Sequence, residues 1–125
     1  MLPHYWPMTD GAKRADERDR IAMMWLPVVD NLERALALAA ADPAAAVDAV
    51  RAVRDEAVDL LAALGYPRRE EIGVPFDPEV HEAVGVAAGV DAEPGTVVRV
   101  LRPGYGARPR VLRPAAVVIA ERRGA

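Results

Sequence analysis

Three side chains near the middle of this sequence are of the types that bind metal ions or transfer protons. Asp77, His81 and Glu82 fall within six residues, and Asp77 and His81 are four positions apart, so a helical turn would place them on one face. One imidazole and two carboxylates can hold a divalent cation or act as a general acid and base. These residues define one candidate function, that of a metal-dependent enzyme.

The rest of the sequence gives catalysis little support. The other histidine, His4, lies near the start of the chain, no glycine-rich phosphate loop occurs, and serine and cysteine are both absent. Nucleophilic catalysis by serine or cysteine, cysteine-based zinc sites and disulfides are therefore excluded. A lone histidine without a second ligand set more often has a structural role. We favour a turn built by Asp77 and Pro78, with His81 partly buried and hydrogen-bonded, and expect no enzyme activity and no cofactor.

The charge of the chain is polarised along the sequence. The net charge is −3, yet residues 96–125 contain seven arginines and one glutamate, a local charge of +6, so the first 95 residues carry −9. Nucleic-acid surfaces interleave basic and aromatic residues, whereas Tyr105 is the one stacking ring among these arginines and lysine is almost absent. Arginine also pairs bidentately with carboxylates, so we expect a protein partner and no nucleic acid.

Length and hydropathy limit the architecture and the compartment. A chain of 125 residues can form one compact domain or two small subdomains. No apolar segment approaches the roughly 20 residues that a membrane-spanning helix needs, and residues 1–8 lack the plan of a secretory signal. We expect no membrane association and a cytoplasmic location.

Apolar spacing predicts two amphipathic helices in the first half. Residues 1–9 are expected to be irregular, with Thr9 or Asp10 capping a helix that kinks at Pro27 or restarts there. Because the apolar seam continues across the proline, we favour the kink. A second helix should begin at Asp42-Pro43 and end at Leu64-Gly65.

The apolar faces of both helices are too broad for a two-helix hairpin to cover. Either the back half of the same chain covers them, or two chains pair into a four-helix bundle, which we predict. The residues expected at this dimer interface are Ile21, Trp25, Val28, Leu32, Val50, Val53, Leu60 and Leu64.

The second half predicts short strands. Glycine and proline interrupt it frequently, and the valine-rich runs are 83–90, 96–102 and 111–120. Pro103 and Gly104 fit the central positions of a type II turn, which would join two antiparallel strands through a loop from Tyr105 to Pro109. We therefore expect an α+β fold, with a helical dimerisation region in residues 10–65 and a small all-β domain in residues 66–125.

Several segments together resemble the GrpE family, the nucleotide exchange factors of bacterial Hsp70 chaperones. The resemblance covers residue 26 to the end, and the helical segment 26–36 matches the family's first bundle helix. The motifs in the second half, in family order, are Phe76-Asp77-Pro78, His81-Glu82-Ala83-Val84, Pro94-Gly95-Thr96-Val97, Gly104-Tyr105, and Val111-Leu112-Arg113-Pro114-Ala115 followed by Val117.

The resemblance implies a homodimer whose β domain presses on the nucleotide-binding domain of a DnaK-type Hsp70, so that ADP leaves. The partner-facing positions carried over are Arg110, as an ion-pairing contact, and Ile119 and Leu101, as apolar contacts. Ile119 has an alternative role in the core, and Arg110 an alternative as a solvated loop charge. The family's long paired helix is expected to be shortened here, because about 16 residues, Asp10 to Leu26, precede the bundle seam. The alternative function is an interaction module of the same fold without exchange activity or with another partner.

Overall fold

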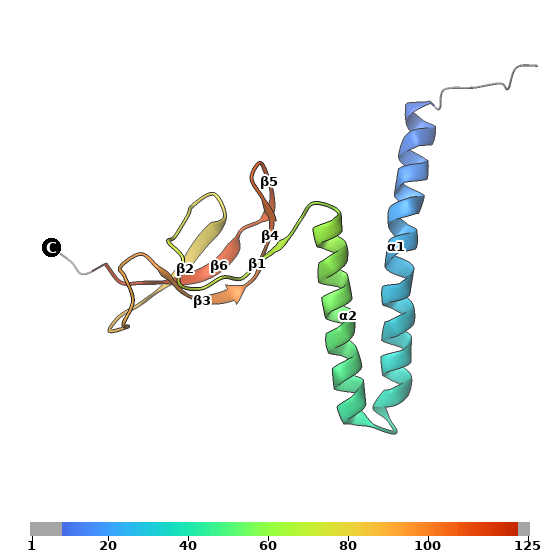
Figure 1. The fold of residues 1–125 in the computed structure, drawn as a ribbon, viewed down its shortest axis with the longest axis horizontal. Helices are drawn as coiled ribbons and strands as arrows, with labels where there is room; N and C mark the ends of the chain where they lie inside the picture. Colours follow the sequence, from blue (N-terminus) through green and yellow to red (C-terminus); the bar gives the residue numbers. More distant parts are fainter. Residues whose placement is uncertain (1–8, 123–125) are drawn as a thin grey trace, which may run out of the picture. The chain divides into compact units, whose positions relative to one another are not determined.

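The computed structural model describes residues 9–122, in which two long helices precede six short strands (Figure 1). The helices are α1 (Asp10–Ala39) and α2 (Pro43–Ala63). The strands are β1 (Arg68–Arg69), β2 (His81–Ala87), β3 (Val97–Arg102), β4 (Gly104–Ala107), β5 (Arg110–Arg113) and β6 (Ala115–Ala120). This order confirms the predicted α+β class. Residues 1–8 of the expected irregular end lie outside the described residues.

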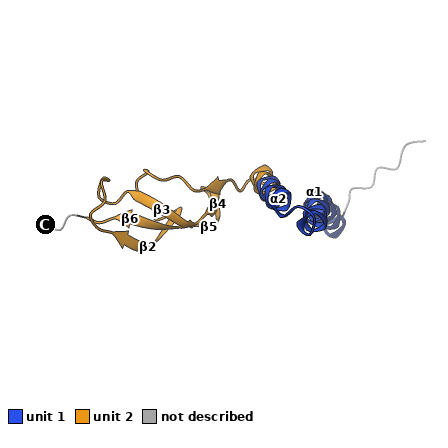
Figure 2. Ribbon diagram, turned by 90° about the horizontal axis from the view of Figure 1, so that it is seen from below, with its two compact units in different colours: residues 1–57 blue, residues 58–125 orange. Residues whose placement is uncertain are grey.

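The chain divides into two compact units, residues 1–57 and residues 58–125 (Figure 2). The first unit contains α1 and most of α2, and the second contains the end of α2 and all the strands. We call the strands and their connections, residues 66–122, the β unit. Along residues 9–122, neither helix combines the length and apolarity needed to cross a membrane.

Helix α1 begins at a side-chain cap and runs through a proline. The Oγ1 of Thr9 accepts a hydrogen bond from the Ala12 N–H at 3.1 Å, which satisfies one of the amides that every helix start leaves unpaired. Pro27 lies inside the helix and has no N–H to donate, yet the helix continues to Ala39. The helix therefore continues through Pro27 without restarting, in agreement with the prediction made from the unbroken apolar seam.

Helix α2 starts and stops at the predicted signals. The Oδ1 of Asp42 accepts a hydrogen bond from the Ala45 N–H at 3.1 Å, and Pro43 is the first helical residue. At the other end Gly65 has a φ of 102°, its N–H donates to the Ala62 carbonyl, and the Tyr66 N–H donates to the Leu61 carbonyl. This pair of bonds is a Schellman motif, which requires the left-handed conformation that glycine adopts easily.

The two helices form an antiparallel hairpin with a narrow contact. Its buried residues are Val28 and Ala35 of α1 and Ala46 and Val53 of α2. Beside them, the Nδ2 of Asn31 donates to both carboxylate oxygens of Glu56 at 3.3 Å, a polar link that favours one register of the two helices. Most other apolar side chains of the hairpin remain at least partly exposed.

The strands form two three-stranded sheets. One sheet has the order β1-β4-β5 and is antiparallel throughout. The other has the order β2-β6-β3, in which β6 pairs in parallel with β2 and antiparallel with β3. The centre of the β unit is a cluster of fully buried residues, Val97, Ala115 and Val117, against which Val74, Phe76, Val100 and Ile119 pack.

The predicted type II turn at Pro103-Gly104 is wrong. Gly104 does not have a positive φ and instead opens β4, where it pairs with Arg69. Glycine is needed there because a Cβ would lie 2.5 Å from the Ala115 backbone N, far inside van der Waals contact. Strands β3 and β4 thus belong to different sheets, and the tight connection falls at Arg108-Pro109, between β4 and β5.

The valine-rich run 111–120 is likewise two strands rather than one. Pro114 separates β5 from β6, because proline cannot donate to a sheet ladder and the chain changes sheets at this point.

Candidate functional site

The Asp77–His81 segment is a hydrogen-bonded turn. The N–H groups of Val80 and His81 donate to the Asp77 carbonyl at 3.1 and 2.8 Å, and the Asp77 N–H donates to His81 Nδ1 at 2.9 Å. The Oδ1 of Asp77 accepts the Glu79 N–H at 3.0 Å, and its Oδ2 pairs with Arg108. The expected turn at Asp77 and Pro78 and the expected hydrogen bond of His81 are present, and His81 is more fully buried than expected.

The geometry of this turn does not suit a metal site. His81 Nδ1 is occupied by a backbone donor, and both Asp77 oxygens face donors rather than a shared cation position. Glu82 is exposed on β2. Within residues 9–122, no three histidine, aspartate or glutamate side chains gather closely enough to hold a metal ion.

His81 is held in its neutral form. Its side chain is 5% exposed and its ring stacks on Phe76, with 5.9 Å between the ring centroids. Burial and, next, the nearby Arg69 cation lower the pKa of His81 from its usual value, outweighing the opposite influence of Asp77 and Glu71. Because Nδ1 accepts the Asp77 N–H, the neutral ring carries its proton on Nε2.

This arrangement predicts that the β unit loses stability in acid. The folded-state pKa of His81 is lowered, so its contribution is fully present above the unfolded pKa of about 6.5 and is lost as pH falls toward the folded value. His81→Asn keeps an acceptor at the position of Nδ1 but cannot titrate. Between pH about 7 and about 5, the urea midpoint of the β unit, followed by NMR, should fall further in the wild type than in this variant. Equal pH slopes would contradict the assignment.

The three predicted partner-binding residues lie on three different strands. Arg110 is exposed at the start of β5, and Leu101 on β3 is 53% exposed. Ile119 on β6 is half-buried, pairs with Val97 and packs against the central cluster, so it takes part in the core. Arg110 and Leu101 are therefore accessible to a partner in the described chain, whereas Ile119 is accessible only in part.

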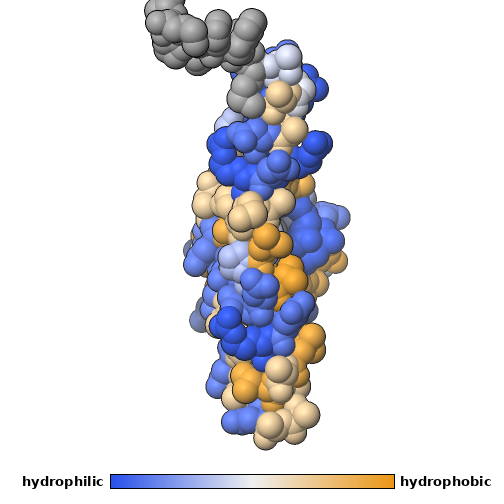
Figure 3. All heavy atoms as spheres, turned by 90° about the vertical axis from the view of Figure 1, so that its right-hand side faces the viewer, coloured by the Kyte–Doolittle hydropathy of each residue, from blue (hydrophilic) through white to orange (hydrophobic). Residues whose placement is uncertain are grey.

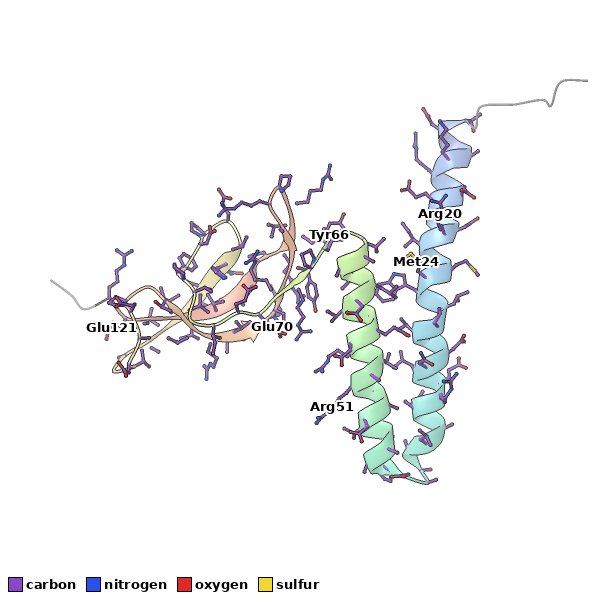
Figure 4. The ribbon with its side chains drawn as sticks, viewed as in Figure 1. Arg20, Met24, Arg51, Tyr66, Glu70 and Glu121 are labelled. Carbon is purple, nitrogen blue, oxygen red and sulfur yellow. The ribbon has the colours of Figure 1, made fainter. Side chains whose placement is uncertain are left out.

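Arg110 borders a shallow hollow that sequence reasoning missed. The hollow has a volume of about 420 Å³ and is lined by Tyr66, Pro109, Arg110, Val111 and Leu112. Leu112 is 58% exposed and shares the exposed face of β5 with Arg110, since side chains two positions apart point to the same side of a strand. That alternation could have been read from the sequence. The contribution of Tyr66, which follows α2 (Figure 4), could not.

Tyr105 and Arg113 make contacts within the β unit. The Arg113 guanidinium lies 5.3 Å from the centroid of the Tyr105 ring and donates two hydrogen bonds, of 2.9 and 3.2 Å, to the Pro103 carbonyl. On the other side, Arg68 Nη1 donates to the Tyr105 hydroxyl at 3.2 Å. These contacts hold β1, β4 and β5 together.

The helical hairpin carries an apolar groove near its loop. The groove has a volume of about 680 Å³. In Figure 3 hydrophobic residues appear in patches between hydrophilic ones on the face of the hairpin in view. The residues lining the groove are Leu32, Ala35, Leu36, Ala39, Pro43, Ala46, Val47, Val50 and Arg51. Leu36 is 73% exposed and Val47 is 52% exposed, an unusual degree of exposure for large aliphatic residues side by side.

The residues predicted for the dimer interface divide into two groups. Val28 and Val53 are buried inside the chain's own hairpin. The other six are exposed or half-buried, namely Ile21, Trp25, Leu32, Val50, Leu60 and Leu64, and Leu32 and Val50 line the groove.

The described residues thus combine a helical hairpin that carries an apolar groove with a small β unit, an α+β architecture. Comparison with known proteins gives the family. The GrpE family model matches residues 12–121, which include nearly all of α1 and every strand. The chain belongs to the GrpE family.

Individual relatives agree with this assignment. The chain is 61% identical over 110 residues to a protein named GrpE 2 of Streptomyces avermitilis, covering 88% of the chain and 54% of the relative. It is 42% identical over 98 residues to GrpE of Thermus thermophilus, covering 78% and 54%, and 37% identical over 106 residues to GrpE of Vibrio vulnificus, covering 82% and 54%. The chain thus spans about half the length of these curated relatives.

Proposed function

We propose that this protein is a GrpE-type co-chaperone, a homodimer that binds the nucleotide-binding domain of a DnaK-type Hsp70 in the cytoplasm and accelerates ADP release. The observation that carries the proposal is the family match across residues 12–121, which includes both the hairpin and the β unit. The exposed position of Arg110 is in keeping with it, because the resemblance to the family implies a contact with the chaperone at this residue.

The proposed mechanism requires no covalent step. The exchange factor binds the open form of the Hsp70 better than the closed, ADP-holding form, and this difference in affinity opens the nucleotide cleft. By reciprocity, it weakens ADP binding by the same factor by which ADP weakens the complex. Arg110 supplies a charge-assisted contact with a carboxylate of the Hsp70, and Leu101 and the exposed part of Ile119 supply apolar area.

The apolar groove supports the homodimer. Four side chains of the hairpin are buried in the single chain, and Leu36, Val47, Val50 and Leu32 remain 39–73% exposed along one groove. A second copy of the hairpin presents the same apolar surface, so two copies can cover each other in an isologous four-helix bundle.

A charge placed in the groove should therefore prevent dimerisation. Leu36→Glu buries a carboxylate in the proposed interface but costs the single hairpin little, because Leu36 is 73% exposed there. Sedimentation at micromolar concentration should give a dimer for the wild type and a monomer for this variant. Met23→Glu is the matched control, since Met23 is 64% exposed on the same helix but does not line the groove, and it should remain dimeric. A monomeric wild type would contradict the proposed dimer.

The release of a fluorescent ADP analogue from the cognate Hsp70 tests the exchange activity directly. Acceleration supports the proposal. Binding to the Hsp70 without acceleration would replace it by the second candidate, an interaction module on the same fold.

A further inference from the structure

The tip of the β4–β5 hairpin is tied to the other sheet by a single arginine. Arg108, in the two-residue connection between the strands, directs its Nη2 to Asp77 Oδ2 and its Nε to Glu79 Oε2. Asp77 and Glu79 belong to the turn that precedes β2, so the ion pairs join the sheet β1-β4-β5 to the sheet β2-β6-β3.

The turn that pairs with Arg108 has hydrogen bonds of its own. Asp77 Oδ1 accepts the Glu79 N–H at 3.0 Å, which orients the carboxylate, and the Asp77 N–H donates to the buried ring of His81 at 2.9 Å. His81 is in turn the first residue of β2 and pairs with Ala115 of β6. The Asp77 carboxylate and the backbone of the turn are therefore held to the core of the β unit by hydrogen bonds, whereas the exposed Glu79 carboxylate pairs with Arg108.

The hairpin tip has few other anchors. Outside the β4–β5 ladder, β4 is anchored as far as Gly106, whose N–H donates to the Pro67 carbonyl at 2.9 Å, and Arg108 lies two residues beyond it, roughly 7 Å away at about 3.3 Å per residue. A two-stranded tip without other support is a mobile element. Arg110 follows Arg108 by two residues and pairs with Ala107 across the hairpin, so its position depends on that of the tip.

We propose that Arg108 is a positioning residue, whose ion pairs with Asp77 and Glu79 hold the β4–β5 tip and thereby set the place of the partner-binding Arg110. We call these two ion pairs the tether. The predicted effect of the tether on partner binding rests on the proposed function, but its effect on the motion of the tip does not. The side chains of Arg108, Asp77 and Glu79 are 56%, 35% and 62% exposed, so salt screens the ion pairs. The tether therefore restricts motion of the tip more than it stabilises the fold.

Amide hydrogen exchange tests the tether without any Hsp70. In Arg108→Gln at low salt, the amides of Ala107, Arg110 and Leu112 should exchange about tenfold faster than in the wild type, while those of Val117 and Val118 stay unchanged. Added salt should raise the wild-type rates at the tip toward those of the variant, and the melting temperature should shift by no more than about 4 °C. Arg108→Lys, which keeps the charge but not the two-pronged geometry, should fall between them.

The matched control is Arg122→Gln, which removes the same charge after β6. Arg122 follows Glu121, which lies at the opposite end of the β unit from Tyr66 (Figure 4). This control should exchange tip amides as the wild type does. Unchanged tip exchange in Arg108→Gln, or equally fast exchange in Arg122→Gln, would overturn the tether.

The effect on function is measured separately. If the tether positions Arg110, Arg108→Gln should accelerate ADP release several-fold less than the wild type at equal concentration, and the difference should shrink at high salt. Faster tip exchange with wild-type ADP release would overturn the positioning role. A wild-type protein that fails to accelerate release would overturn the proposed function and leave the amide-exchange result as the test of the tether.

Discussion

Gly106→Ala should unfold the β unit or lower its free energy of unfolding by about 4 kcal/mol or more. Gly106 lies in β4 with a φ of 100°, and a Cβ there would lie 2.3 Å from the Arg110 carbonyl O and 2.9 Å from the Leu112 backbone N. Both neighbours are backbone atoms of the paired strand, so neither can move without breaking the β4–β5 ladder.

Two further glycines distinguish the two causes of this loss of stability, which are the left-handed backbone strain and the steric clash of the added Cβ. Gly73 has a φ of 79° with open space around its missing Cβ, so Gly73→Ala should cost only the left-handed strain, about 1–2 kcal/mol. Gly104 has no positive φ but faces the Ala115 backbone N at 2.5 Å, so Gly104→Ala should cost about 3 kcal/mol from the clash alone. Urea unfolding, monitored through the amide signals of β6, measures the loss of stability in all three variants. A Gly106→Ala loss no larger than that of Gly73→Ala would contradict the close packing of β4 on β5.

Arg110→Ala should reduce the acceleration of ADP release by roughly 10- to 100-fold at subsaturating protein. Arginines at the centre of interfaces often contribute 2 kcal/mol or more, and this one is exposed on β5 beside Tyr66 and Leu112. Stability should change little, since the side chain is exposed. Arg110→Lys should recover only part of the activity, because lysine cannot form a bidentate pair.

The control for this prediction is Arg122→Ala, which lowers the charge of the β unit by the same amount as Arg110→Ala. If Arg110→Ala and Arg122→Ala lose the same small amount, the contribution of Arg110 is long-range electrostatics only. Wild-type activity in Arg110→Ala would remove it from the interface.

The helices were predictable because their signals are local. Thr9, Asp42 and Gly65 are caps whose hydrogen bonds reach only three to five residues along the chain, and the structure shows them at the predicted places. The apolar spacing also found the seam of each helix. Spacing could not tell that Val28 and Val53 meet inside one hairpin while Leu36 and Val47 stay exposed, because that depends on how the two helices face each other.

The β unit was predictable only in outline. Its strands appear near the expected valine-rich runs, but the pairing of β4 with β1 and of β2 with β6 joins residues more than 30 positions apart. Pro103-Gly104 illustrates the difficulty, since the same dipeptide suits a turn and a close backbone crossing, and only the Ala115 backbone decides between them. The Arg108–Asp77 ion pair joins residues 31 positions apart, so the local spacing of residues could not predict it.

A turn at Asp77 was favoured over a metal site from the sequence alone, and the partner contacts were already expected at Arg110, Ile119 and Leu101. Asp77 and His81 do share a turn, as their spacing predicted, but their hydrogen-bonding groups face Arg108 and the backbone. The exposed residues suited to a partner lie instead on β5 and β3, where alternation places Arg110, Leu112 and Leu101 outward.

The most direct test of the proposed function is the release rate of a fluorescent ADP analogue from the cognate Hsp70, measured by stopped flow after mixing with excess unlabelled nucleotide. With this protein at saturating concentration, the rate should rise roughly tenfold or more, and the apparent affinity for the analogue should fall by roughly 5- to 150-fold. An unchanged release rate at saturating protein, with binding to the Hsp70 verified independently, would contradict the assignment as an exchange factor.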